Sequence, residues 1–115
     1  MNDHDFFHFA KCRFINCLKT LKGKSNEYSR ANDKLHNFKA AGRKRDITPE
    51  RALDGMALKH EISIDDIIND IDAGKLPARD VLTEKIIDRI NYLVLLNALI
   101  EERIQRADLE KLYEK

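Results

Sequence analysis

The chain has 115 residues, of which 36% are charged and 7% aromatic, with four glycines and two prolines. This length and composition predict one helical domain with a modest core, and they exclude a strand-rich fold or two domains. No apolar run reaches the roughly 18 residues that a membrane span needs, and the acidic start lacks the basic region of a signal peptide. Cys12 and Cys17 lie five apart on a predicted helix and cannot pair within it, which favours the reducing cytoplasm.

The net charge of +1 hides an uneven distribution of charge. Residues 11–45 carry eleven Lys or Arg against two acids, whereas residues 46–115 carry ten basic residues against sixteen acidic ones. This asymmetry favours an anionic partner at the basic end and a cation at the acidic end, although solvated helix faces can carry the same imbalance.

Residues 1–23 are predicted to form the first helix. Asp3 or Asp5 can cap its start, and Gly23 is expected to end it. Its apolar side chains recur at helical spacing: Phe7, Phe14, Leu18 and Leu21. Residues 24–47 then predict a basic loop that contains one short helix over residues 33–41, ended by Gly42.

Residues 48–74 predict a long helix. Thr48 as N-cap followed by Pro49 is a strong start signal, and Gly74 is a stop signal. Gly55 lies inside the helix and predicts the close approach of another backbone. His60 lies on the apolar stripe, where it is either an ordinary hydrogen-bonded core histidine or part of a site.

Residues 80–112 predict the central helix, capped by Asp80 or Thr83. A wide apolar stripe predicts that this helix is buried over most of its circumference: Ile86, Ile90, Leu93, Ile100 and Ile104, widened by Ile87, Val94, Leu96 and Leu99. Four short helices barely enclose such a stripe, so we expect a second subunit to cover one face of the bundle.

A polar line of Glu84, Asp88 and Asn91 interrupts the stripe of the central helix. If the two long helices pack antiparallel, Glu61 and Asp65 could approach Glu84 and Asp88 across the interface. Such carboxylates repel one another without a cation, and their hard oxygens suit Mg²⁺ or Mn²⁺. Equally, they could be ordinary solvated or ion-paired side chains. The fold class expected is an all-α four-helix bundle with two long antiparallel helices.

Known catalytic loops are missing from the sequence. There is no glycine-rich phosphate loop, no G-x-S-x-G elbow and no plausible Cys/His pairing, so covalent catalysis is not predicted. Phosphates would have to be bound by side chains, which the basic segment supplies, and by metal.

Four blocks of sequence resemble a known family: K-x-x-E-Y from Lys24, N-F-K from Asn37, T-P-x-x-A-L-x-G-M-x-x-K-H from Thr48, and E-K-x-x-D-x-x-N-Y-L from Glu84. The blocks look like those of small phage and prophage proteins. These in turn resemble nucleotide-modification-associated domains related to MazG-like, all-α nucleoside triphosphate pyrophosphohydrolases. The resemblance covers residues 24 to about 100.

The resemblance implies a MazG-like bundle that forms a dimer or tetramer in the host cytoplasm and hydrolyses a nucleoside triphosphate to the monophosphate and pyrophosphate. Mg²⁺, or Mn²⁺, would be held by Glu61, Glu84 and Asp88. The expected nucleotide-binding residues are Lys24, Tyr28, Asn37, Lys39, Lys59, His60 and Asn91.

Two other functions stay open. The family shows E-x-x-E followed by E-x-x-D, whereas both acidic pairs here are spaced E-x3-D. This departure favours a non-enzymatic protein that sequesters a host nucleotide signal or inhibits a host protein. Nucleic-acid binding through the basic segment ranks last, because the rest of the chain is acidic and has no helix-turn-helix signature. A helical bundle whose charged faces are merely solvated, with none of these functions, also stays open.

Overall fold

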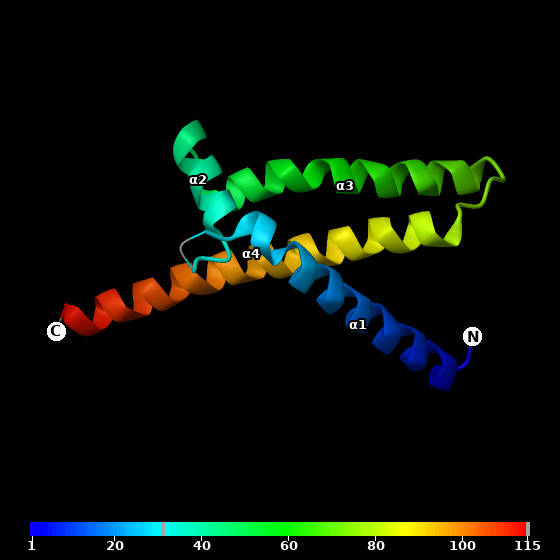
Figure 1. Cartoon of the computed structure of the whole chain (residues 1–115), viewed down its shortest axis with the longest axis horizontal. Coiled ribbons are helices and arrows are strands. Elements are labelled where there is room, and N and C mark those ends of the chain that lie inside the picture. The colour runs from blue at the N-terminus through cyan, green and yellow to red at the C-terminus, as the bar shows by residue number, and fades with distance from the viewer. Residues whose placement is uncertain (31, 115) are drawn as a thin grey trace.

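The computed structural model describes residues 1–30 and 32–114, apart from the side chains of residues 25–28. The described residues form four helices, α1 (Asp3–Tyr28), α2 (His36–Arg45), α3 (Pro49–Asp72) and α4 (Arg79–Tyr113), and contain no strand (Figure 1). Helices α3 and α4 form an antiparallel hairpin, and α1, with 26 residues, is also long. The predicted all-α fold with four helices is therefore confirmed. Among the described residues, no helix is long and apolar enough to cross a membrane.

The start and end of α3 follow from local sequence, as predicted. The Thr48 hydroxyl accepts a hydrogen bond from the Arg51 backbone N–H at 3.1 Å, and Pro49 occupies the first helical position. The helix stops before Gly74, whose φ of +86° is a conformation that glycine adopts without strain. The predicted cap of α4 is wrong, because Ala78 is the N-cap and both Asp80 and Thr83 lie inside the helix.

The two predicted stops at glycine are also wrong. α1 continues through Gly23 to Tyr28, and α2 continues through Gly42 to Arg45. Within a helix a glycine costs only about 1 kcal/mol relative to alanine, so a single glycine need not end it. The left-handed residue that closes α2 is Asp46, with φ 56° and ψ 46°.

The core lies where α2 meets α3 and α4. Phe38 is fully buried, and the buried residues around it are Leu35, Leu53, Leu95 and Leu99. The ring of Tyr92 packs edge-on against Phe38, with the ring centroids 6.3 Å apart.

The face of α4 that is buried differs from the predicted one. Its buried residues are Ile87, Asp88, Asn91, Leu95 and Leu99, so Asp88 and Asn91 of the polar line face the other helices, whereas Glu84 is exposed. Leu93, Ile100 and Ile104 of the predicted stripe are 54%, 42% and 50% exposed. Burial over most of the circumference is therefore wrong for a single chain, because α1, α2 and α3 cover only one side of α4.

Candidate functional site

The polar centre of the molecule is Asp88, which is buried where α1, α3 and α4 meet. The Lys24 ammonium from α1 lies 3.4 Å from Asp88 Oδ1, and His60 Nδ1 from α3 lies 3.8 Å from Asp88 Oδ2. The side chain of Asp88 is only 10% exposed, and that of Lys24 is 43% exposed. The carboxylate thus has one half-exposed cationic partner and one aromatic neighbour, His60, whose side chain is 12% exposed.

His60 is a neutral neighbour of this carboxylate at pH 7. Burial lowers the pKa of His60 below its ordinary value of 6.5. The Asp88 carboxylate opposes this shift, and Lys59, Lys85 and Lys24 add to it. The ring packs against Tyr92 with the centroids 4.7 Å apart. His60 therefore leaves the negative charge of Asp88 to be balanced by Lys24.

The lowered pKa of His60 predicts a pH dependence of stability. The unfolded chain takes up a proton at His60 more readily than the folded one, so this contribution is full above about pH 6.5 and is lost as the pH falls below it. We expect the free energy of unfolding to decrease between pH 7 and 5, with a slope of at most about 1.4 kcal/mol per pH unit from this group. Urea titrations at each pH measure the slope.

The matched variants for this test are His60→Gln and His4→Gln. His60→Gln should remove the slope, whereas His4→Gln should keep it because the His4 side chain is 93% exposed. The carboxyl groups of Asp33 and Glu50 have lowered pKa values, so their effect on the free energy of unfolding falls at more acidic pH. If the slope were unchanged in His60→Gln, the pH dependence of stability could not be assigned to His60.

A cleft of 450 Å³ opens beside Asp88, between α1 and the first turns of α4. We call it the Asp88 cleft, and it is lined by Thr20, Lys24, Asp80, Thr83, Glu84, Ile87 and Asp88. Asp80, Glu84 and Asp88 are spaced by four residues, so they share one face of α4. Asp80 was predicted from sequence only as a cap, although the same spacing could have identified it as part of the site.

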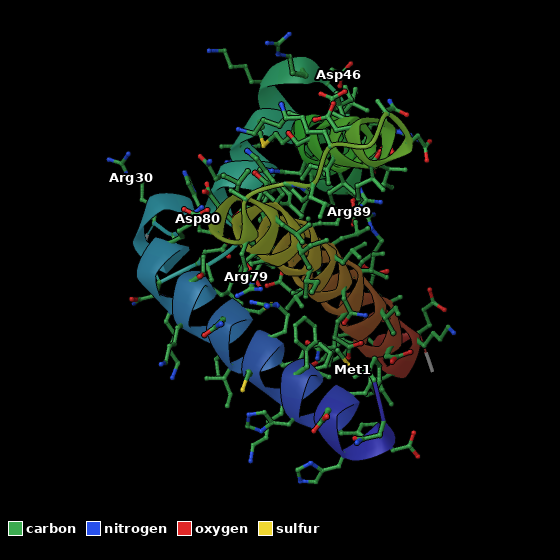
Figure 2. All side chains as sticks on the ribbon, turned by 90° about the vertical axis from the view of Figure 1, so that its right-hand side faces the viewer. Met1, Arg30, Asp46, Arg79, Asp80 and Arg89 are labelled. Carbon is green, nitrogen blue, oxygen red and sulfur yellow. The ribbon has the colours of Figure 1, made fainter. Side chains whose placement is uncertain are left out.

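Glu61 does not join these carboxylates. It forms an ion pair with Arg89, which follows Asp88 and projects from a different face of α4. Figure 2 shows Asp80 and Arg89 on opposite sides of the N-terminal end of α4. Among the described residues, no group of three or more His, Cys, Asp or Glu side chains is arranged to hold a metal ion. The predicted set of Glu61, Glu84 and Asp88 is therefore split, with two members in the Asp88 cleft.

Asn91 holds the two helices of the cleft together. Its side-chain amide donates a hydrogen bond to the Cys17 carbonyl of α1 at 3.1 Å, and Asn91 is 7% exposed. It also lines a narrow gap of 10 Å³ beside Lys24 and Asp88. Its observed partner is thus the backbone of α1.

Lys39 lies away from the Asp88 cleft and has two carboxylate partners. Its ammonium is 2.8 Å from both Asp33 and Glu102, and these bonds raise the pKa of Lys39. It lines a different cleft of 400 Å³ together with Gly42, Arg43, Asp46, Ile47, Pro49, Arg103 and Arg106.

Two of the remaining predicted nucleotide contacts are not brought to the Asp88 cleft. Asn37 in α2 and Lys59 in α3 do not line that cleft. The side chain of Tyr28 lies outside the described residues. Of the seven nucleotide-binding residues predicted from sequence, the structure therefore gathers Lys24, His60 and Asn91 around Asp88.

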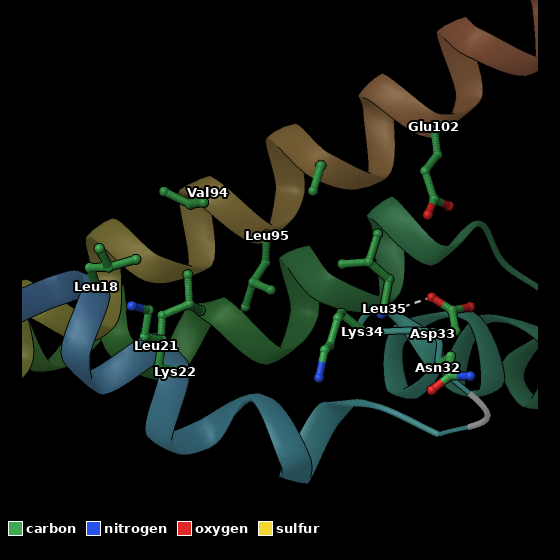
Figure 3. Close-up of a pocket in the computed structure, with 11 residues that line it drawn as sticks. Leu18, Leu21, Lys22, Asn32, Asp33, Lys34, Leu35, Val94, Leu95 and Glu102 are labelled. Atoms are coloured by element: carbon green, nitrogen blue, oxygen red, sulfur yellow. Dashed lines mark hydrogen bonds between the residues drawn. The ribbon is translucent and has the colours of Figure 1, made fainter.

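A third cleft, of 530 Å³, lies between α1 and a later part of α4 and is mainly apolar (Figure 3). We call it the apolar cleft. Its apolar walls are Leu18 and Leu21 from α1, Leu35, and Val94, Leu95 and Ala98 from α4. Its polar rim consists of Lys22, Asn32, Asp33, Lys34 and Glu102.

No protein-family model, curated protein or solved structure matches this chain.

Proposed function

We propose that this protein binds a nucleoside triphosphate in the Asp88 cleft together with Mg²⁺, for which Mn²⁺ can substitute, and hydrolyses it to the monophosphate and pyrophosphate. One observation carries the proposal: Asp80, Glu84 and Asp88 line the same 450 Å³ cleft as the Lys24 ammonium. Carboxylates beside a cation suit a ligand in which a metal ion is bound to phosphate. The resemblance in sequence suggests the same chemistry.

The carboxylates of the cleft fit Mg²⁺ in kind and number. Mg²⁺ in nucleotide sites keeps several waters and is bound through one or two carboxylates plus phosphate oxygens. Glu84 and Asp88 supply such a pair without Glu61. When bound, the ion polarises the phosphates and lowers the pKa of an attacking water.

Lys24 is the residue that can exchange partners in this mechanism. Its side chain is 43% exposed and its contact with Asp88, at 3.4 Å, is long for a charged hydrogen bond. Turning toward an incoming phosphate would let Lys24 neutralise the ligand and release Asp88 Oδ1. His60 stays against Oδ2, where it holds the orientation of the carboxylate. Asn91 keeps α1, and with it Lys24, in place.

The proposal is tested by thermal unfolding with nucleoside triphosphates and cyclic dinucleotides, each with and without Mg²⁺. A ligand that binds only the native state raises the midpoint even if no turnover occurs. We expect an Mg²⁺-dependent rise with a triphosphate, and Glu84→Gln should weaken that binding by about tenfold or more. Glu110→Gln is the control, because Glu110 is exposed on the same helix and far from the cleft.

Release of pyrophosphate is then measured with the nucleotide that binds. No Mg²⁺-dependent rise with any triphosphate, or equal affinity in Glu84→Gln and the wild type, would reject the proposal.

A second function is favoured by the ion pairs at the site. Asp88 already has Lys24, and Glu61 already has Arg89. A protein that sequesters a nucleotide signal or blocks a host protein needs no metal at these carboxylates. This alternative predicts a midpoint rise that is independent of Mg²⁺, with no product even in Mn²⁺.

We also propose that the protein acts as a homo-oligomer, a dimer or a tetramer. The exposed apolar residues of α4, including Leu93, Ile100 and Ile104, support this proposal.

A further inference from the structure

The chain is far more extended than a compact domain of its length. Its radius of gyration is 17.7 Å, whereas about 13 Å is typical of a chain this long. Its accessible surface is 8961 Å², whereas a monomer of 13.4 kDa exposes about 6,500 Å². The excess is about 2,500 Å² per chain, or about 5,000 Å² for two chains, which lies at the upper end of the total area that obligate dimers bury.

Part of this exposed surface lies on α1, whose N-terminal half projects away from α3 and α4 (Figure 1). Phe7, Phe14 and Leu18 are 66%, 64% and 53% exposed. With Leu21 they repeat at spacings of seven, four and three residues, which places them on one face of the helix. Leu18 and Leu21 also line the apolar cleft, so this face runs from the cleft to the free end of α1.

We infer that a second copy of this chain covers this face, and that the two α1 helices pack antiparallel about a two-fold axis at Phe14. In such a pair each residue faces the one equally far from Phe14 on the other side. Phe7 of one copy then faces Leu21 of the other, since both are seven residues from Phe14. Because Leu21 lines the apolar cleft, Phe7 is placed to enter that cleft.

The apolar cleft suits an aromatic ring from the second copy. Its 530 Å³ is open to solvent and is lined by Leu18, Leu21, Val94 and Leu95 among others, and aromatic rings seated in such pockets dominate many interfaces.

This arrangement rests on the homo-oligomer proposed above and is independent of nucleotide binding. The interface can therefore be disproved without affecting the proposed nucleotide binding, and nucleotide binding can be disproved without affecting the interface.

The first test is the mass in solution of three full-length proteins, measured by light scattering over a range of concentrations. We expect the wild type at twice the 13.4 kDa of one chain. Phe7→Glu should weaken association on the order of 100-fold, because each dimer contains the substitution twice. Phe9→Glu is the matched control: Phe9 is 50% exposed but lies about 200° around the helix from Phe7, so its dimer should persist.

The second test is cross-linking, which also covers the case in which Phe7→Glu does not fold. In the Cys12→Ser background, Phe14→Cys places a thiol at the two-fold axis, and mild oxidation should link two chains. The wild type is the control, because its exposed Cys12 lies about 200° from Phe14 and Cys17 is buried. A monomeric wild type would overturn both the oligomer and this interface. An oligomer that resists Phe7→Glu, and in which Phe14→Cys forms no cross-link, would overturn this interface alone.

Discussion

Replacing Phe38 with alanine should lower the free energy of unfolding by about 3–5 kcal/mol. Phe38 has no exposed surface and lies among Leu35, Leu53, Leu95 and Leu99. Its removal leaves a cavity at the point where α2 is joined to α3 and α4, and it removes the edge contact with the ring of Tyr92. The loss is a large fraction of the roughly 5–15 kcal/mol that holds a domain of this size folded.

Urea unfolding followed by circular dichroism measures this loss. Phe9→Ala is the control, since its ring is 50% exposed and loses only the contact with the Arg13 guanidinium, so its replacement should change stability by less than about 1 kcal/mol. Phe38→Leu keeps most of the volume and should cost less than Phe38→Ala. If the alanine variants at positions 38 and 9 were equally stable, the core described above would be incorrect.

Local signals explain why the α3–α4 hairpin could be predicted from the sequence. The start of α3 depends on Thr48 and Pro49, and its end on Gly74, all within a few residues of the boundary. The helix ends predicted at Gly23 and Gly42 were wrong, because glycine permits a helix to end but does not require it to end. The left-handed backbone conformation that ends α2 is adopted by Asp46. Aspartate takes this conformation less often than glycine does, so it is a weaker signal in the sequence.

The face of α4 that packs inward could not be predicted, because an apolar stripe can be covered either by the same chain or by another chain. Leu93, Ile100 and Ile104 were expected in the core of the chain, but they are about half exposed. The face that packs inward includes Asp88 and Asn91, whose polar groups are matched by Lys24 and by the Cys17 carbonyl. Partners 64 and 74 residues away in the chain leave no local signal.

The packing of α4 also decides which predicted site residues meet. His60 and Glu61 are neighbours in sequence but lie about 100° apart around α3, so one approaches Asp88 and the other Arg89. Helical spacing correctly placed Glu84 and Asp88 on one face of α4, whereas the placement of Glu61 depended on how α3 faces α4. Lys39 was expected near phosphates, and its place beside Asp33 and Glu102 depends on the packing of α2.

Gly42 and Gly55 show that helical glycines in this chain have different roles. A Cβ at Gly42 would lie 2.9 Å from the Ile47 carbonyl oxygen and 3.1 Å from the Pro49 nitrogen. These are backbone atoms, which cannot turn aside as a flexible side chain can. A Cβ at Gly55 would meet nothing within 4 Å among the described residues. The backbone approach predicted from sequence at Gly55 is therefore wrong for this chain, and it occurs at Gly42.

Substituting alanine at the two positions should therefore change stability in opposite directions. Gly42→Ala should destabilise by about 1–3 kcal/mol, because the link between α2 and α3 must shift to admit the methyl group. Gly55→Ala should stabilise by up to about 1 kcal/mol, because alanine is the better helix former. Urea unfolding at one protein concentration compares both with the wild type. Gly42→Ala as stable as the wild type would show that the approach at Ile47 is looser than described. A destabilised Gly55→Ala would instead indicate that a second chain packs closely there.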